Sequence, residues 1–491
     1  MNLKIAKIFS CLKLILLIAI LSILSSSLSS ASEYRVKSVN ELKSALKTVQ
    51  PGDRIIMING EWRDAKILFE ASGTKEKPII LKAETAGEVI LTGSSSLRIA
   101  GDYLIADGLY FKDGALEKGS VIEFRKDEDK SSNYSRLTNT VIVDYNPPVK
   151  ETEYKWVSLY GTHNRVDHCY FRNKVNAGCL LVVWLEDKPN YHLIDSNYFA
   201  FRPELGVNGA EIIRVGTSHW SMYPSYTTVE NNYFEQCNGE REIISNKSFY
   251  NTYRHNTFVE CRGALTLRHG NYCTVEGNYF FGNNIKGTGG IRIIGEGHKV
   301  INNYIADTEG ADAFSAISFM NGVKDSPLNR YFQVKDALVA FNTLINNRTS
   351  FEIGVGKNEE LSLPPVNSTI ANNIVFSTKG KLVTETDTPQ NFKWEGNIFY
   401  GSEMGMNPND GVRFIDPKLE KGKDGLWRQT NFSPSRNAAA GKYDLVNVDI
   451  DGQIRKEPKD IGSDQISDEK NIYRPLTKKD VGPCWFINNM K

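Results

Sequence analysis

Asparagine recurs along the chain in front of an aromatic or branched residue, and this repeat constrains the fold more than any other feature of the sequence. It occurs in eight motifs, namely SNYF (Asn197), NNYF (Asn232), HNTF (Asn256), GNYF (Asn278), NNYI (Asn303), FNTL (Asn342), NNIV (Asn373) and GNIF (Asn397). Successive asparagines are 35, 24, 22, 25, 39, 31 and 24 residues apart. A shortest period of 22 to 25 residues with occasional longer steps indicates one solenoid coil per repeat, with insertions in loops.

Each repeat contains short β-rich runs separated by Gly, Asn or Asp, without a helical period between them. Leucine-rich repeats share this length, but their LxxLxL pattern is missing, and propeller blades would need about 40 residues each. We therefore predict an all-β chain folded as a right-handed parallel β-helix. Stacked asparagines at the turns would bond one coil to the next. Their regular recurrence favours this structural role over ligand binding.

The two ends of such a solenoid expose strand edges that must be covered. Ser38 and Glu41 have the spacing of a capping box, and ELKSALKTV then carries apolar residues at helical spacing, which predicts an N-terminal capping helix. At the other end the repeat fades after Asn397. We expect residues 32–491 to form one domain, with an irregular C-terminal cap from about residue 405.

Residues 1–31 differ from the rest of the chain. Three lysines precede the apolar run LILLIAILSIL, and the small residues SSSLSSA follow it, as in a secretory signal peptide cleaved near Ala31. We therefore expect an exported protein, periplasmic or extracellular, with no membrane segment in its mature form. The formal net charge of +1 gives no support to nucleic acid as a partner. Six cysteines remain in the mature chain without a CxxC pair, and buried free thiols are their expected state.

Charged residues with catalytic potential gather between residues 240 and 270. Glu240 and Glu242 are two apart and share one face of a strand, so their carboxylates can converge on a hard cation. Lys247 and Arg268 follow as candidates for proton transfer beside that cation. Lys247 lies an odd number of positions from the acids, so a bend in the strand is needed. The alternative interpretation is a solvated strand face with ordinary salt bridges.

Four runs carry a family resemblance: NGAEIIRVG (208–216), EREIISNK (240–247), GALTLRHG (263–270) and GGIRIIGEGH (289–298). Together with PGDRIIMINGEW and DIDGQIRKEPKDIGSD, they resemble the pattern of polysaccharide lyase family 6, which contains alginate lyases and chondroitinase B. The resemblance implies a parallel β-helix and calcium-assisted β-elimination. It also implies that Asn208, Glu240 and Glu242 bind Ca²⁺, that Lys247 is the base and that Arg268 is the acid.

Physical chemistry supports these roles. Removal of the C5 proton of a uronate places negative charge on the adjoining carboxylate, where a bound cation is most effective. Lys247 acts as a base only when neutral, a form that nearby positive charge favours. Because guanidinium releases a proton reluctantly, Arg268 has the alternative role of stabilising the leaving oxygen while water supplies the proton. Further candidates for substrate binding are Arg292, His269, Arg214, His298 and Tyr223.

Three functions remain to be compared. A lyase acting on an acidic polysaccharide accounts for the paired acids with Lys and Arg. A glycoside hydrolase would need an Asp/Glu pair or trio as acid and base, and a non-catalytic β-helix would only bind glycans. Within the lyases, NGAEIIRVGTSHW looks more like the alginate-acting members than the dermatan sulfate lyases, and no basic cluster suits sulfate. We therefore expect alginate as the substrate.

Overall fold

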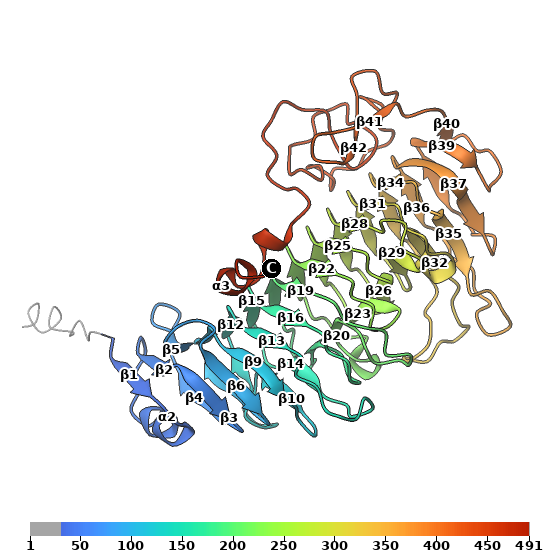
Figure 1. Cartoon of the computed structure of the whole chain (residues 1–491). Coiled ribbons are helices and arrows are strands. Elements are labelled where there is room, and N and C mark those ends of the chain that lie inside the picture. Colours follow the sequence, from blue (N-terminus) through green and yellow to red (C-terminus); the bar gives the residue numbers. More distant parts are fainter. Residues whose placement is uncertain (1–30, 491) are drawn as a thin grey trace, which may run out of the picture.

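A computed structural model describes residues 31–490, and the predicted signal peptide lies almost entirely outside them. The chain winds into a right-handed parallel β-helix, as predicted (Figure 1). Each coil contributes one strand to each of three faces, A, C and B in chain order. Apart from one hairpin, the named strands pair in parallel with those of neighbouring coils.

Face A contains β1 (Glu33–Val36), β2 (Arg54–Met57), β5 (Ile79–Ala83), β8 (Leu104–Asp107), β12 (Arg136–Thr138), β15 (Arg165–Asp167), β18 (Leu193–Asp195), β21 (Thr228–Glu230), β24 (Thr252–Arg254), β27 (Thr274–Glu276), β30 (Lys299–Ile301), β33 (Leu338–Ala340), β36 (Thr369–Ala371) and β38 (Lys393–Glu395).

Face B contains β4 (Lys66–Ser72), β7 (Ser96–Asp102), β10 (Ser120–Glu123), β11 (Ser132–Asn133), β14 (Lys155–Leu159), β17 (Leu181–Val183), β20 (Ile213–Val215), β23 (Glu242–Lys247), β26 (Gly263–His269), β29 (Thr288–Ile293), β32 (Ile317–Met320) and β35 (Thr349–Val355).

Face C contains β3 (Gly60–Arg63), β6 (Val89–Gly93), β9 (Tyr110–Gly114), β13 (Val141–Val143), β16 (Tyr170–Arg172), β19 (Tyr198–Phe199), β22 (Tyr233–Glu235), β25 (Thr257–Val259), β28 (Tyr279–Phe281), β31 (Tyr304–Ala306), β34 (Thr343–Ile345), β39 (Asn397–Glu403) and β40 (Val412–Phe414). The long strand β37 (Ile374–Glu385) pairs with both β34 and β35 and so joins faces B and C.

The predicted asparagine ladder occupies the corner between faces A and C. Asn232 donates from Nδ2 to Oδ1 of Asn256, which donates in the same way to Asn278, with 3.0 Å between the atoms at both steps. The backbone N–H of each asparagine also donates to the next Oδ1, and the ladder runs unbroken from Asn197 to Asn397. The residue before each ladder asparagine has a positive φ, for example His255 at 53°, which turns the chain between the two faces.

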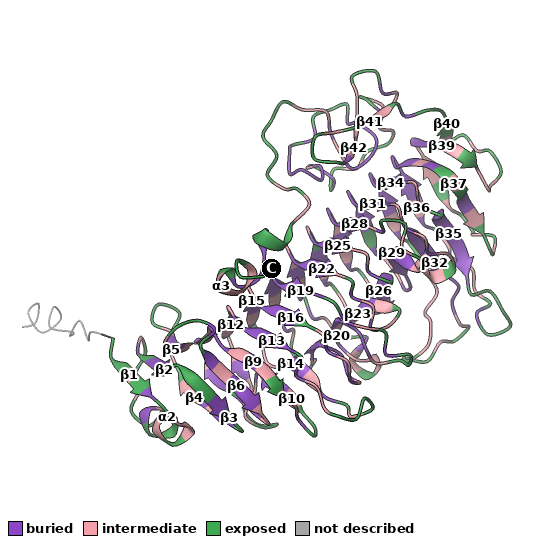
Figure 2. Ribbon diagram, viewed as in Figure 1, coloured by how far each residue is buried: buried purple, intermediate pink, exposed green. Residues whose placement is uncertain are grey.

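The core is the interior of the coil. Residues of alternate parity on each strand point inward, and purple strands fill the centre of Figure 2. Phe199, Phe234, Phe258 and Phe280 stack along one row of face C, with ring centroids 4.5 to 4.9 Å apart. These rows of identical contacts suit a solenoid, in which each coil buries its apolar side chains against the next.

The N-terminal end is closed by helix α2 (Val39–Ala45), which confirms the predicted capping helix. The Glu41 backbone N–H donates to Ser38 Oγ at 3.2 Å, while Glu41 Oε2 accepts from the Lys37 backbone N–H at 2.9 Å. Leu42 and Ala45 face the first coils and are buried. The helix therefore covers apolar side chains that an open first coil would expose.

Beyond β40 the chain leaves the coil and runs back along its side (Figure 1). It forms an antiparallel hairpin of β41 (Leu419–Lys421) and β42 (Trp427–Gln429), and it ends with the short helix α3 (Cys484–Ile487). Leu476 N donates to Thr257 Oγ1 at 2.8 Å, and Trp485 Nε1 donates to Asn139 O at 3.2 Å. The tail therefore packs along the solenoid from its last coils back to its middle.

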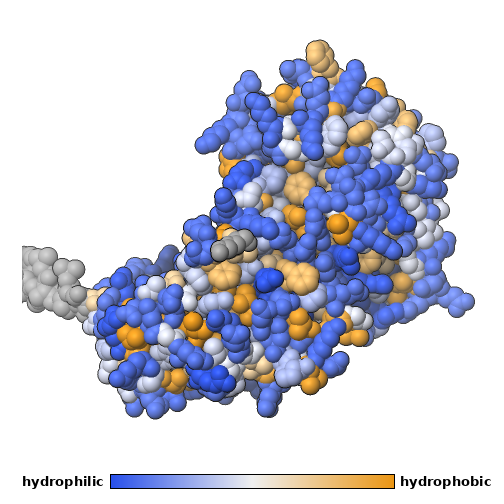
Figure 3. All heavy atoms as spheres, viewed as in Figure 1, coloured by the Kyte–Doolittle hydropathy of each residue, from blue (hydrophilic) through white to orange (hydrophobic). Residues whose placement is uncertain are grey.

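The visible surface is mostly hydrophilic, with hydrophobic residues in several separate groups (Figure 3). Among residues 31–490, no helix is long and apolar enough to cross a membrane. The six cysteines of this part of the chain are free thiols, and five of them are buried, as predicted.

Candidate active site

A groove of about 740 Å³ lies against the outer side of face B, over the coils of β20, β23, β26 and β29. It is lined by Asn208, Glu240, Glu242, Lys247, Arg268, His269 and Arg292, together with residues of the loops that border these strands. The structure therefore brings together seven of the ten residues that the sequence nominates. They come from successive coils because parallel strands in register place residues about one repeat apart side by side.

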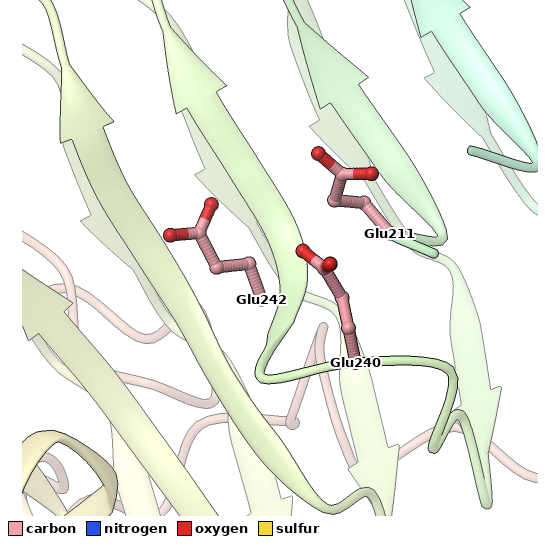
Figure 4. A group of neighbouring side chains, drawn as sticks. All are labelled: Glu211, Glu240 and Glu242. Atoms are coloured by element: carbon pink, nitrogen blue, oxygen red, sulfur yellow. The ribbon is translucent and has the colours of Figure 1, made fainter. Parts of the chain in front are cut away.

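Three carboxylates converge at one end of this groove. Oxygen atoms of Glu211, Glu240 and Glu242 all lie within 4.8 Å of one another, and Figure 4 shows the three side chains on the same side of neighbouring strands, with the Glu240 carboxylate between the other two. Glu240 Oε2 accepts hydrogen bonds from the backbone N–H groups of Gly209 and Ala210, at 2.6 and 3.3 Å. These bonds leave the other Glu240 oxygen facing its neighbours.

The electrostatics of this cluster favour a bound cation. Burial, and then the carboxylates of Glu211 and Glu242, raise the pKa of Glu240. Glu211 Oε2 and Glu240 Oε1 are buried and lack hydrogen-bond partners within the described residues. Unpaired buried carboxylate oxygens are costly unless a cation satisfies them, and oxygen-only ligands are those that Ca²⁺ prefers. The residues present therefore fit a calcium ion.

Asn208 is exposed on the loop before β20 and reaches the same groove. It lies next to Gly209, whose N–H donates to Glu240, but it is not one of the three converging carboxylates. Asn208 is thus an exposed residue of the groove lining, next in the chain to a backbone N–H group that binds the cluster.

Lys247 reaches the groove through an irregularity in its strand. The register between β23 and β26 shifts twice, between Glu242 and Ile244 and again between Asn246 and Lys247. The neighbouring Asn246 points inward, where its Nδ2 donates to the backbone oxygen of His269 at 2.7 Å. These shifts provide the bend that the spacing required, so that Glu242 and Lys247 line one groove despite their opposite parity.

Two arginines lie against Glu242. Arg268 Nε and Arg292 Nη1 are 3.5 and 3.6 Å from Glu242 Oε1, and only 13% and 8% of their side-chain surfaces are exposed. Arg268 also donates to the backbone oxygens of Arg330 and Asn329 at 3.0 and 3.3 Å. Burial lowers the pKa of Arg268. Both guanidinium groups are therefore held in the groove beside the acidic cluster.

The remaining nominated residues have different placements. His269 lines the groove, 3.2 Å from Ser218 Oγ through Nε2, and burial lowers its pKa to about 2. The prediction that His298 binds substrate is wrong, because the residue is fully buried inside the coil. Its Nδ1 accepts from Cys273 N at 3.1 Å and its Nε2 donates to Ile294 O at 2.9 Å, so both ring nitrogens are engaged by backbone. His298 is therefore structural and does not line the groove.

Arg214 and Tyr223 lie beside the groove without lining it. Arg214 projects outward from β20, and its guanidinium carbon is 5.5 Å from the ring centroid of Trp184. Tyr223 is exposed on the following loop and packs edge-on against Trp220, with centroids 4.7 Å apart. Their contact with a long substrate would require the polymer to extend beyond the groove.

Sequence reasoning missed two residues of the site, Glu211 and Tyr331. A signal for Glu211 was present, because the run EII occurs at 211–213 and again at 242–244. Ile213 pairs with Ile244 in the structure, so aligning the two runs places Glu211 beside Glu242. Tyr331 lies on a long loop that no repeat pattern describes, and we find no sequence signal for it.

Positive charge surrounds the acidic cluster. The groove lining includes five basic side chains, Arg241, Lys247, Arg262, Arg268 and Arg292, against the exposed or half-buried acids Glu204, Glu240 and Glu242. A groove with a basic lining and a single acidic pocket suits a polyanion whose carboxylate meets a cation at that pocket.

Comparisons with known proteins agree with this architecture. The family model for chondroitinase B matches residues 36–440. The structure of the PL6 family alginate lyase AlyGC superposes with a TM-score of 0.83 at 39% identity, covering 93% of this chain and 59% of AlyGC. This chain thus spans about three fifths of the AlyGC length. A search of curated proteins found no significant match.

Two further structures match over most of their length. A mannuronic acid specific family 6 lyase from human gut microbiota has a TM-score of 0.70 and 33% identity, covering 78% of this chain and 91% of that enzyme. The PL6 polysaccharide lyase Pedsa3628 from Pseudopedobacter saltans has a TM-score of 0.70 and 32% identity, with 92% and 99% covered. With the family model matching most of its length, the chain belongs to polysaccharide lyase family 6.

Proposed function

We propose that the protein is an exported lyase that cleaves alginate by calcium-assisted β-elimination and releases unsaturated oligosaccharides. The observation that carries this proposal is the convergence of Glu211, Glu240 and Glu242 beside Lys247 and two arginines in one groove. A glycoside hydrolase would use such acids without needing the adjoining lysine and arginines.

In this proposal Glu211, Glu240, Glu242 and Asn208 hold Ca²⁺. When bound there, Ca²⁺ neutralises the uronate carboxylate and stabilises the negative charge that develops as the C5 proton leaves. Arg292 and His269 help to orient the sugar, with Arg214 and Tyr223 available to a longer chain. Lys247 is the base and takes the C5 proton on a neutral amine.

The electron pair of the broken C5–H bond forms the C4–C5 double bond, and the C4–O bond to the leaving sugar breaks. Arg268, held beside Glu242, stabilises the charge on the departing oxygen, and water supplies its proton, because guanidinium itself donates poorly. Every atom is then accounted for by substrate, Lys247 and water.

Alginate is favoured as the substrate because the matched family 6 structures with a named substrate are alginate lyases or a mannuronic acid specific lyase. The chondroitinase B family model keeps dermatan sulfate as the alternative. Purified protein should be assayed on polyguluronate, polymannuronate and dermatan sulfate by ultraviolet absorbance of the unsaturated uronate, with and without chelator. If only dermatan sulfate gives unsaturated product, dermatan sulfate and not alginate is the substrate. If the protein binds these polymers and forms no product, it is a glycan-binding protein and not a lyase.

Export rests on the N-terminal sequence, which lies outside the described residues except for Ala31. Sequencing of the mature N-terminus from a secreting host should find cleavage near Ala31. A full-length protein retained in the cytoplasm would reject this part of the proposal.

A further inference from the structure

The longest step in the asparagine repeat, between Asn303 and Asn342, contains a loop that closes one side of the groove. Residues 321–337 connect β32 of face B to β33 of face A. The loop is braced by the next one along the chain: Gly322 and Leu363 exchange two backbone hydrogen bonds of 2.7 and 3.0 Å, and Arg330 pairs with Glu360. It is therefore a fixed wall of the groove.

Tyr331 of this wall contacts both arginines of the site. The guanidinium carbon of Arg268 is 4.1 Å from the centroid of the Tyr331 ring, and that of Arg292 is 5.4 Å away. Arg292 Nη2 also donates to the Tyr331 hydroxyl at 3.0 Å. The ring packs in turn against the small apolar cluster of Ile294, Met320 and Val355, which holds it in place.

The two guanidinium groups repel each other, and the structure offers them two shared partners, Glu242 and Tyr331. If Glu242 turns its carboxylate to a cation, its attraction for the arginines weakens. The electron-rich face and hydroxyl of Tyr331 then remain to hold both guanidinium groups. Arg292 depends on it most, because its Nε is buried and has no hydrogen-bond partner within residues 31–490.

We propose that Tyr331 is a positioning residue that keeps Arg268 and Arg292 in their working geometry when the acidic cluster is engaged by the cation and substrate. This inference rests on the proposed function of the groove. The hydroxyl orients Arg292 toward the substrate, and the ring supports Arg268 beside the leaving oxygen. The two parts of one side chain thus act on binding and on turnover separately.

The test separates these two parts. Tyr331→Phe removes only the hydroxyl and should raise KM for the cleaved polyuronate about 10- to 150-fold, the range of one hydrogen bond to a charged group, with kcat within about twofold. Tyr331→Leu removes the ring as well and should also lower kcat about 10- to 100-fold. Tyr272→Phe is the matched control, because its hydroxyl also bonds a charged side chain, Glu296, at 2.9 Å, outside the groove, and it should leave both constants unchanged.

A double-mutant cycle then tests whether the Tyr331 hydroxyl acts through Arg292. Tyr331→Phe in an Arg292→Ala background should change KM by less than about twofold, because the arginine it positions is gone. An unchanged KM in Tyr331→Phe, or effects of the two substitutions that multiply, would overturn the inference. If Tyr331→Leu does not fold, Tyr331→Phe and its double-mutant cycle with Arg292→Ala still test the role of Tyr331.

The affinity for an oligouronate, measured by calorimetry in the presence of calcium, should show the same coupling between Tyr331→Phe and Arg292→Ala. A wild-type protein that binds but never cleaves would reject the lyase proposal, while coupling in affinity would still support the role of Tyr331. Cleavage by wild type with independent effects of Tyr331 and Arg292 would reject the role of Tyr331 alone.

Discussion

Glu242 lies against Arg268 of the next coil, with 3.5 Å between Oε1 and Nε. The same carboxylate belongs to the cluster of three that fits a cation. A single side chain thus stands between the proposed metal site and the proposed leaving-group site. Substitutions on either side of it should separate the two functions.

We predict that calcium affinity depends on Glu211 as strongly as on Glu242. Glu211→Gln should weaken calcium binding at least about tenfold, because a buried negative ligand becomes neutral. Calorimetry on metal-free protein measures this directly, and chelator should abolish wild-type activity. Glu296→Gln, which lies outside the groove, serves as the control. Wild-type affinity in Glu211→Gln would remove Glu211 from the site.

Lys247→Ala should lower turnover by about two to four orders of magnitude, the usual contribution of a positioned base. Calcium affinity and oligouronate affinity should change little, because Lys247 is not one of the converging carboxylates. The measurement is the initial rate of unsaturated product, with Lys299→Ala on the exposed side of face A as the control. Near-normal turnover would place the base elsewhere.

The two arginines beside Glu242 should differ in their kinetic effects. Arg268→Ala should lower kcat by about two to four orders of magnitude with a smaller change in KM, since it acts on charge that develops as the bond breaks. Arg292→Ala should mainly raise KM. Full progress curves on the preferred polyuronate distinguish the two, and the reverse pattern would exchange their proposed roles.

The asparagine ladder should contribute strongly to stability. Asn256→Ala removes the side-chain donor to Asn278 Oδ1 and leaves the backbone and side-chain N–H groups of Asn232 without their buried acceptor. We expect a loss of about 2 to 4 kcal/mol in the free energy of unfolding, from unpaired buried polar groups. Denaturant unfolding measures it, and Asn407→Ala, at an exposed asparagine outside the left-handed backbone region, should cost less than about 0.5 kcal/mol.

Acid should destabilise the fold through its buried histidines. Burial lowers the pKa of His298 from 6.5 to about 4, so between these values the unfolded chain binds a proton that the native chain does not. Stability from this residue is therefore complete above pH 6.5 and is lost as the pH falls toward 4. Between pH 7 and pH 5 the loss is about 2 kcal/mol.

His298→Gln can keep both backbone hydrogen bonds without titrating, so its unfolding free energy should fall about 2 kcal/mol less than that of wild type over this range. The exposed His219→Gln should behave as wild type. Equal pH dependence in all three proteins would contradict the assignment.

The repeat made the fold predictable, whereas loops and corners limited the prediction of the site. The positions of Asn232, Asn256 and Asn278 placed strands in coils, and coils in register placed Glu240 and Glu242 near Arg268. Strand alternation alone could not place His298, because it follows β29 at a corner where parity is lost.

The place of Tyr331 in the site could not be predicted from the sequence for a related reason. Its position depends on how the loop of residues 321–337 folds against the next loop, and that contact has no period in the sequence. Glu211, in contrast, could have been found, since the repeated EII run encodes its register with Glu242.

The ladder corner lies between faces A and C, while the long loops leave from the two ends of face B. Each of the three long steps of the repeat adds its extra residues there, after β19, β20, β32 or β35. Insertions and deletions in these loops leave the amide hydrogen bonds of the opposite corner in register. Evolution, or an engineer, can therefore exchange the walls of the groove between related enzymes as separate modules, while the scaffold beneath them continues to fold unchanged.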